Sequence, residues 1–161
     1  LPAQSMGQAA TTFVGQNLGA GNVKRARDGV KQTNRIGVGV LIAISALMGV
    51  SASWLVSLFS KDPGVLYYGT LFVWIAVPFR FCSAWNQIYA GALRGAGDAR
   101  GPMLIMLFSF VFCRQAYLFI VTRFAFNVYT VGLGYPVGWI VCSTLSAIYY
   151  RRSRWEKAQG L

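Results

Sequence analysis

The stretch from Ile36 to Ser60 reads IGVGVLIAISALMGVSASWLVSLFS and decides the fold class. It contains no charged residue, and it lacks the polar stripe that a helix on the surface of a soluble protein carries. Its length is sufficient for a helix that crosses a bilayer core, which takes roughly 20 residues. The stretch therefore predicts a transmembrane helix.

The rest of the 161-residue chain is organised in the same way, because its charged residues form short clusters between apolar blocks. Charged residues make up 12% of the chain, whereas a soluble domain has about 25%. If Arg80 and Arg114 are accepted inside blocks, the sequence predicts an all-α, polytopic transmembrane helix bundle of about five spans. The predicted spans are 1–20, 36–59, 65–92, 103–123 and 130–150, followed by a tail at 151–161. The first span is the most polar, and a helix on the membrane surface is the alternative for it.

The net charge of +11 follows from the junctions between the spans. Alternate junctions place eleven Lys and Arg residues on one side of the predicted bundle and two on the other. Because basic loops stay in the cytoplasm, we expect an integral protein of the plasma (cytoplasmic) membrane with a cytoplasmic C-terminus. The expected partner is the lipid bilayer. A nucleic-acid partner is not expected, because the basic residues flank apolar spans instead of forming one folded face.

The composition excludes several kinds of catalytic and metal site. The chain has no His and four carboxylates, which rules out His-based triads and most zinc sites. Cys82, Cys113 and Cys142 lie in different predicted spans, where packing explains them better than chemistry does. We therefore expect no enzyme activity, no metal site and no cofactor.

Two stretches of the chain share the pattern G-x-x-x-G-A-G-[N/D]. They run from Gly15 to Asn22 (GQNLGAGN) and from Gly91 to Asp98 (GALRGAGD), each at the same end of a predicted span. Glycines at such positions cap helices in the left-handed conformation and let backbones approach, and the final Asn or Asp can cap the next helix. The spacing is not that of a phosphate-binding G-x-G-x-x-G loop.

In their longer contexts, GQAATTFVGQNLGAGNVKRARDGVKQTNRIG and QIYAGALRGAGDARGPM, these stretches resemble the multidrug and toxic compound extrusion (MATE) transporters. The family-motif residues are Gly15, Gln16, Asn17, Gly19, Gly21, Gly91, Arg94, Gly95, Gly97 and Asp98. The resemblance implies a partial C-terminal lobe of a twelve-helix transporter, corresponding to helices eight to twelve. It also implies a missing N-terminal lobe as partner and a small organic substrate.

A transporter of this kind exchanges organic compounds for Na⁺ or H⁺ by alternating access, as the resemblance implies. All four carboxylates lie outside the predicted spans. A buried ionisable group is needed to bind a coupling ion at membrane depth. We therefore expect the coupling Na⁺ or H⁺ to bind in the missing N-terminal lobe.

A substrate cleft at membrane depth requires polar and aromatic side chains. Gln4, Gln8 and Thr11 share one helical face, and Pro78 should bend the third span near its middle. Packing or an interfacial belt is the alternative for Trp74, and interhelical hydrogen bonding is the alternative for Gln8 and Asn86. The candidate cleft residues are Gln4, Gln8, Thr11, Trp74, Arg80, Asn86, Gln87, Arg114 and Gln115.

Arg80 and Arg114 require compensation, since an Arg inside a bilayer costs about 3 kcal/mol on insertion scales. Each must meet water, a helix carbonyl, the missing lobe or an anionic ligand. In a cleft they would favour anionic or zwitterionic substrates, and snorkelling or carbonyl pairing is the alternative. Two other functions stay open: a lipid-linked oligosaccharide flippase of the same superfamily, whose arginines would face a pyrophosphate, and a non-transporting structural membrane subunit.

Overall fold

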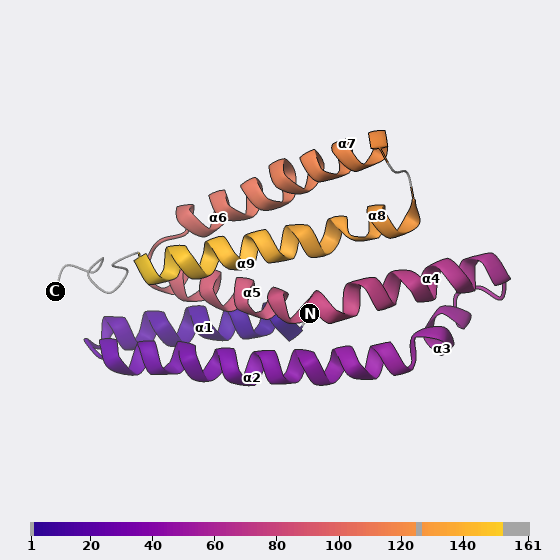
Figure 1. Ribbon diagram of the computed structural model, residues 1–161. Coiled ribbons are helices and arrows are strands. Elements are labelled where there is room, and N and C mark those ends of the chain that lie inside the picture. Colours follow the sequence, from indigo (N-terminus) through magenta and orange to yellow (C-terminus); the bar gives the residue numbers. More distant parts are fainter. Residues whose placement is uncertain (1, 125–126, 153–161) are drawn as a thin grey trace.

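A computed structural model describes residues 2–124 and 127–152, in which the regular elements are helices and there is no strand (Figure 1). The all-α prediction is therefore confirmed. The elements are α1 (Pro2–Gly19), α2 (Val23–Val50), α3 (Ala52–Ser57), α4 (Pro63–Ala76), a 3₁₀ turn η1 (Val77–Phe79), α5 (Arg80–Gly95), α6 (Arg100–Leu107), a π-helix η2 (Phe108–Cys113), α7 (Arg114–Phe124), α8 (Val128–Gly132) and α9 (Gly134–Arg152).

Four helical stretches in the described part of the chain are long and apolar enough to cross a membrane. They are Val23–Val50, Pro63–Gly95, Arg100–Phe124 and Val128–Arg152. They overlap four of the five predicted spans, but the predicted span 36–59 is divided, because α2 ends at Val50 and Ala52–Ser57 form the separate helix α3. The remaining predicted span, 1–20, forms helix α1. Because of its Gln and Thr residues, α1 is not among the helices that are apolar enough to cross a membrane. That α1 crosses the membrane stays a prediction.

Helix α5 lies at the centre of the arrangement. It packs against α1 and α2 on one side and against α9 on the other, and the α6–η2–α7 stretch covers α9 (Figure 1). The core between α1, α2 and α5 contains many small side chains, such as Ala10, Ala26 and Ala84, which are 0–1% exposed. Small residues let helix backbones approach each other, which is the usual basis of helix packing in membranes.

Two of the long helical stretches are interrupted where the sequence contains proline or paired glycines. Pro78 lies in η1 and separates α4 from α5, as predicted, because proline has no N–H to donate within a helix. Leu133 separates α8 from α9, between Gly132 and Gly134. The π-helix η2 was not predicted from the sequence.

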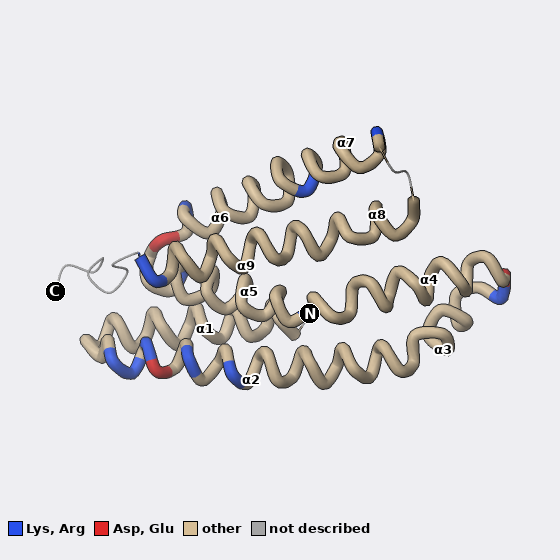
Figure 2. Tube along the Cα trace, viewed as in Figure 1, with Lys and Arg blue, Asp and Glu red and all other residues tan. Residues whose placement is uncertain are grey.

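Most of the Lys and Arg residues of the described chain lie at one end of the bundle, which we call the basic end (Figure 2). It contains the turn between α1 and α2, the turn between α5 and α6 and the last described residues of α9. The basic segment 24–35 is not a loop, because α2 begins at Val23. Of the predicted tail 151–161, residues 153–161 lie outside the described part.

Candidate functional site

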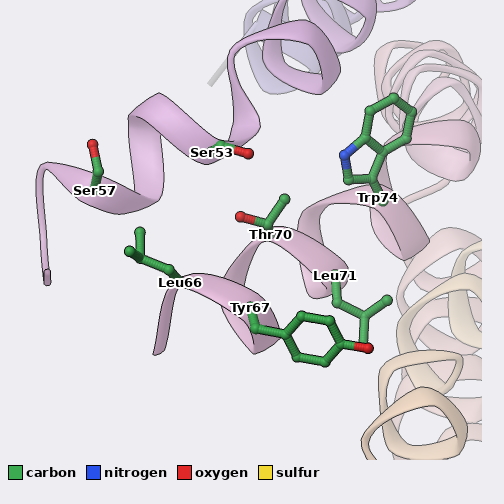
Figure 3. A pocket seen from close by; sticks show the side chains of 7 residues that line it. All are labelled: Ser53, Ser57, Leu66, Tyr67, Thr70, Leu71 and Trp74. Carbon is green, nitrogen blue, oxygen red and sulfur yellow. The ribbon is translucent and has the colours of Figure 1, made fainter. Parts of the chain in front are cut away.

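A pocket of about 560 Å³ lies between α3 and α4, away from the basic end (Figures 1 and 3). It is lined on one side by Ser53 and Ser57 of α3 and on the other by residues of α4, which are Leu66, Tyr67, Thr70, Leu71 and Trp74 (Figure 3). The Trp74 side chain is 56% exposed and stands at one end of the pocket. Of the candidate cleft residues, Trp74 is therefore the one that the structure places in this pocket.

The turn between α3 and α4 positions this pocket. Asp62 caps α4, since its Oδ1 accepts hydrogen bonds from the N–H groups of Gly64 at 2.8 Å and Val65 at 3.2 Å. Pro63 occupies the first turn of α4, where its missing N–H costs nothing. Gly69 then lets α3 approach, because a Cβ at this position would lie 2.8 Å from Cγ1 of Val56.

The chemistry of the pocket is aromatic and hydroxyl-bearing, with no charged residue in its lining. The Trp74 and Tyr67 rings can stack on planar compounds or contact a cation through their π-faces. The Ser57 hydroxyl donates to the carbonyl of Trp54 at 2.7 Å, which leaves its oxygen as an acceptor. Such a pocket suits a neutral or cationic organic compound better than an anion.

The other predicted cleft residues on α1 and α5 do not line this pocket. Gln4 and Gln8 are exposed on α1, and the Thr11 hydroxyl donates to the carbonyl of Gly7 in its own helix at 2.9 Å. Asn86 is 5% exposed, and its Oδ1 accepts a hydrogen bond from Ser146 of α9 at 3.2 Å. For Asn86 the structure thus shows the interhelical hydrogen bond that was the alternative to a cleft position.

The glycines next to these residues bring α1 and α5 into backbone contact, and we call Gly7, Gly91 and Gly95 the glycine contact. A Cβ on Gly91 would overlap the carbonyl oxygen of Gly7, and one on Gly95 would overlap the carbonyl oxygen of Thr11. A Cβ on Gly7 would lie 2.7 Å from the carbonyl oxygen of Gln87. The half-buried Gln87 therefore lies at the α1–α5 interface. Gly7 was missed in the sequence, although small residues spaced by four along α1 could have indicated it.

The two G-x-x-x-G-A-G motifs form the same helix cap. Gly21 and Gly97 have φ of +73° and +92°, the left-handed conformation that was predicted. The N–H of the following residue, Asn22 or Asp98, donates to the carbonyl five residues earlier, at 2.7 and 2.9 Å. Both turns are therefore Schellman motifs. By contrast, a Cβ added to Gly19 would meet no neighbour.

The two motifs differ in their last residue and in their middle. Asp98 accepts a hydrogen bond from the N–H of Gly101 at 2.9 Å and so caps the start of α6, as predicted. Asn22 makes no such side-chain bond at the start of α2.

The middle residues of both motifs bond within their own helices. The exposed Arg94 donates to the carbonyl of Ala90 at 3.2 Å, and the buried Asn17 donates to the carbonyl of Phe13 at 2.8 Å. Gln16 and Gly15 complete the first motif, Gln16 being exposed and Gly15 half-buried.

Arg114 has a partner that was not among the predicted ones. Its guanidinium lies 4.0 Å from the centre of the Tyr135 ring, a cation–π contact between α7 and α9. Its Nε is buried without a hydrogen bond. A Cβ on Gly138 would lie 3.0 Å from the Phe110 ring and 3.7 Å from Cδ of Arg114, so this glycine leaves room mainly for Phe110. Arg80 is half-buried at the start of α5, and Gln115 is exposed beside Arg114.

Among the described residues there is no group of three His, Cys, Asp or Glu side chains that could hold a metal ion. The expected position of the coupling ion, in another lobe, stays a prediction. The distinctive features of the described part of the chain are the uncharged, aromatic pocket between α3 and α4 and the close contacts between helices.

Comparison with known proteins identifies the family. The family model MatE matches residues 1–120. The chain is 29% identical over 157 residues to "Probable multidrug resistance protein YpnP" of Bacillus subtilis, covering 97% of this chain and 35% of that protein. It is 27% identical over 158 residues to "Probable multidrug resistance protein NorM" of Thermotoga maritima, covering 98% and 34%.

A third relative, "Multidrug resistance protein PmpM" of Pseudomonas aeruginosa, is 32% identical over 106 residues, which cover 66% of this chain and 22% of PmpM. The chain thus spans about a third or less of the length of these curated relatives. No solved structure matches it. The family model covers both glycine motifs and well over half of the chain, so the chain belongs to the MatE family, the multidrug and toxic compound extrusion family that its motifs indicated.

Proposed function

We propose that the chain is part of a secondary active multidrug efflux antiporter that exchanges organic compounds for Na⁺ or H⁺ by alternating access. The observation that carries this proposal is the match of the MatE family model to residues 1–120. The names of the curated relatives, all multidrug resistance proteins, support the same activity. Membership of a transporter family also supports a role other than catalysis.

The α3–α4 pocket supports a specific class of exported compound. Its lining is uncharged and combines the Trp74 and Tyr67 rings with serine and threonine hydroxyls. Planar or cationic amphipathic compounds would stack on the rings, and the hydroxyls would form hydrogen bonds with the polar groups of the compound. Arg114, which would repel cations, is engaged by Tyr135 on α9 and does not line this pocket.

We infer that the chain forms part of the C-terminal lobe of the transporter, with its basic end in the cytoplasm. The clustering of Lys and Arg at one end of the bundle supports this orientation through the positive-inside rule (Figure 2). The lobe would move against an N-terminal lobe, which would also hold the coupling ion. Tight packing of α1 on α5 through the glycine contact favours rigid-body movement of this part.

An export assay on the complete protein tests the proposal. Cells that lack their own drug exporters would express the unaltered protein, Trp74→Ala or Trp74→Phe, and ethidium accumulation would be followed by fluorescence. We expect Trp74→Ala to raise the apparent KM for export about tenfold through loss of ring contact, while Trp74→Phe retains most of the activity. Trp54→Ala is the matched control, since Trp54 is 63% exposed on α3 and does not line the pocket.

Antiport is tested separately in proteoliposomes that contain the purified protein. An imposed Na⁺ or H⁺ gradient should drive ethidium uptake against its concentration, and removal of that gradient should stop it. Transport that proceeds equally without either gradient would contradict antiport. Absence of any ethidium export by a folded, membrane-inserted protein would contradict the drug-export proposal itself.

A further inference from the structure

A second apolar cavity, a groove of about 450 Å³, runs between α5 and α9. Phe81 and Trp85 of α5 form one wall, with their rings edge to face and centroids 5.6 Å apart. Small side chains of α9, Ser143 and Ala147, form part of the lining, and Arg151 closes the groove at the basic end. None of its lining residues is acidic.

The length of the groove matches one leaflet of a membrane. On α9 its lining extends from Ile140 to Arg151, a distance of about 16 Å at 1.5 Å per residue. The hydrocarbon core of a bilayer is about 30 Å thick, so the groove covers about half of it. Arg151 is the penultimate residue of α9 and lies at the end of the apolar stretch Val128–Arg152. With the helices crossing a membrane in the orientation proposed above, the groove would span one leaflet, and Arg151 would lie near the headgroups of that leaflet.

The polar groups along the groove are already used within the protein. The Ser143 hydroxyl donates to the carbonyl of Cys82 at 2.6 Å, and the Thr144 hydroxyl donates to the carbonyl of Ile140 at 2.8 Å. The groove therefore offers apolar contacts along its length. At its end it offers one charged hydrogen-bond donor, the guanidinium of the exposed Arg151. A complementary ligand has a long apolar chain and one anionic end.

We propose that this groove binds an anionic phospholipid of the leaflet at the basic end. One acyl chain lies between α5 and α9 against the Trp85 ring, and the lipid phosphate pairs with the Arg151 guanidinium. Arg152 beside it adds to the positive charge at the same level. The site requires the membrane position of the helices and does not depend on the export activity proposed above.

Native mass spectrometry of the complete protein in detergent tests this site. Dioleoyl phosphatidylglycerol and dioleoyl phosphatidylcholine have the same chains and differ in headgroup charge. We expect the unaltered protein to bind phosphatidylglycerol preferentially, and Arg151→Gln to weaken that binding about fivefold. Arg151→Lys should keep most of the preference, because the charge remains. Ala147→Leu, which fills the groove, should weaken binding while leaving the charge in place.

Arg100→Gln is the matched control, because Arg100 is an exposed arginine at the same end of the bundle that does not line the groove. Circular dichroism would verify that each variant is folded. Equal binding of the two lipids to the unaltered protein would overturn the proposal. An equal effect of Arg100→Gln and Arg151→Gln would also overturn it, because lipids would then be attracted to the basic end in general. Full lipid binding by folded Ala147→Leu would overturn it as well, because the lipid would then lie elsewhere.

Discussion

The hydroxyl of Tyr149 on α9 donates a hydrogen bond to Oδ2 of Asp98, in the turn between α5 and α6, at 2.7 Å. The other carboxylate oxygen of Asp98 accepts from the N–H of Gly101. Gly101 also makes room for the tyrosine, since a Cβ there would lie 2.5 Å from the Tyr149 ring. One carboxylate of the second glycine motif therefore joins the end of α5, the start of α6 and the last helix.

Loss of this hydrogen bond should destabilise the basic end. We expect Tyr149→Phe to lower the free energy of unfolding by about 1 kcal/mol, because the Asp98 carboxylate loses a partner in a half-buried site. Unfolding of the purified protein in mixed micelles, followed by circular dichroism, measures the change. Tyr68→Phe, at an exposed position on α4, is the control and should leave stability unchanged. An equal effect of both variants would contradict a specific role of the Asp98 bond.

The glycine contact predicts a strong effect of one added methyl group. Gly91→Ala would place its Cβ against the carbonyl oxygen of Gly7, and both atoms belong to helices that cannot yield locally. Such overpacking costs about 1–3 kcal/mol, measured by the same unfolding experiment. Gly19→Ala tests the same substitution in the first motif at a position with open space, and it should be neutral or slightly stabilising. If Gly91→Ala is as stable as Gly19→Ala, the helices do not touch as described.

The caps after α1 and α5 predict a dependence on left-handed backbone conformation. Gly97→Ala should cost about 1–2 kcal/mol, because φ at this position is +92° and a Cβ there is strained. Gly97→Asn should cost less, because Asn adopts the left-handed conformation more readily. Comparing the thermal midpoints of the two variants separates backbone strain from loss of space, since no atom lies within 4 Å of an added Cβ.

The contact between Arg114 and Tyr135 should appear as a coupling energy. A double-mutant cycle with Arg114→Leu and Tyr135→Leu should give about 0.5–2 kcal/mol, because the guanidinium lies 4.0 Å from the ring centre and is partly desolvated. The cycle for Arg123 and Phe119, which are 5.4 Å apart and exposed, should give a smaller value. Equal coupling in the two cycles would refute a special role of the Tyr135 ring.

The local features of this fold could be read from the sequence because each depends on a few neighbouring residues. Pro78 interrupts its helix because proline lacks an N–H, and Gly21 and Gly97 end theirs because glycine tolerates positive φ. The apolar block from Ile36 to Ser60 is largely helical, as α2 up to Val50 and as α3, because in a membrane every backbone group needs a partner within its own segment. The sequence predicts a junction before residue 36, whereas α2 begins at Val23 and includes the basic residues of this junction in its first turns.

The candidate site was less predictable, because it depends on which helix faces meet. Trp74 lines the α3–α4 pocket, whereas Asn86 on the next helix turned out to bond with Ser146. Both residues are compatible with a cleft or with packing when only their own helix is considered. Gly69 and Val56, which bring α3 and α4 together, carry no chemical signal that distinguishes them from other small or apolar residues.

The sequence by itself determined the helical class, the family, the ends of the helices at the glycine caps and the break at Pro78, because hydropathy and backbone conformation are local properties. Only the tertiary structure decided the partners across helices. These are Gly7 against Gly91, Asp98 with Tyr149, and Arg114 over Tyr135. Such pairs join residues far apart in the chain, and their free energy arises only when two particular faces pack.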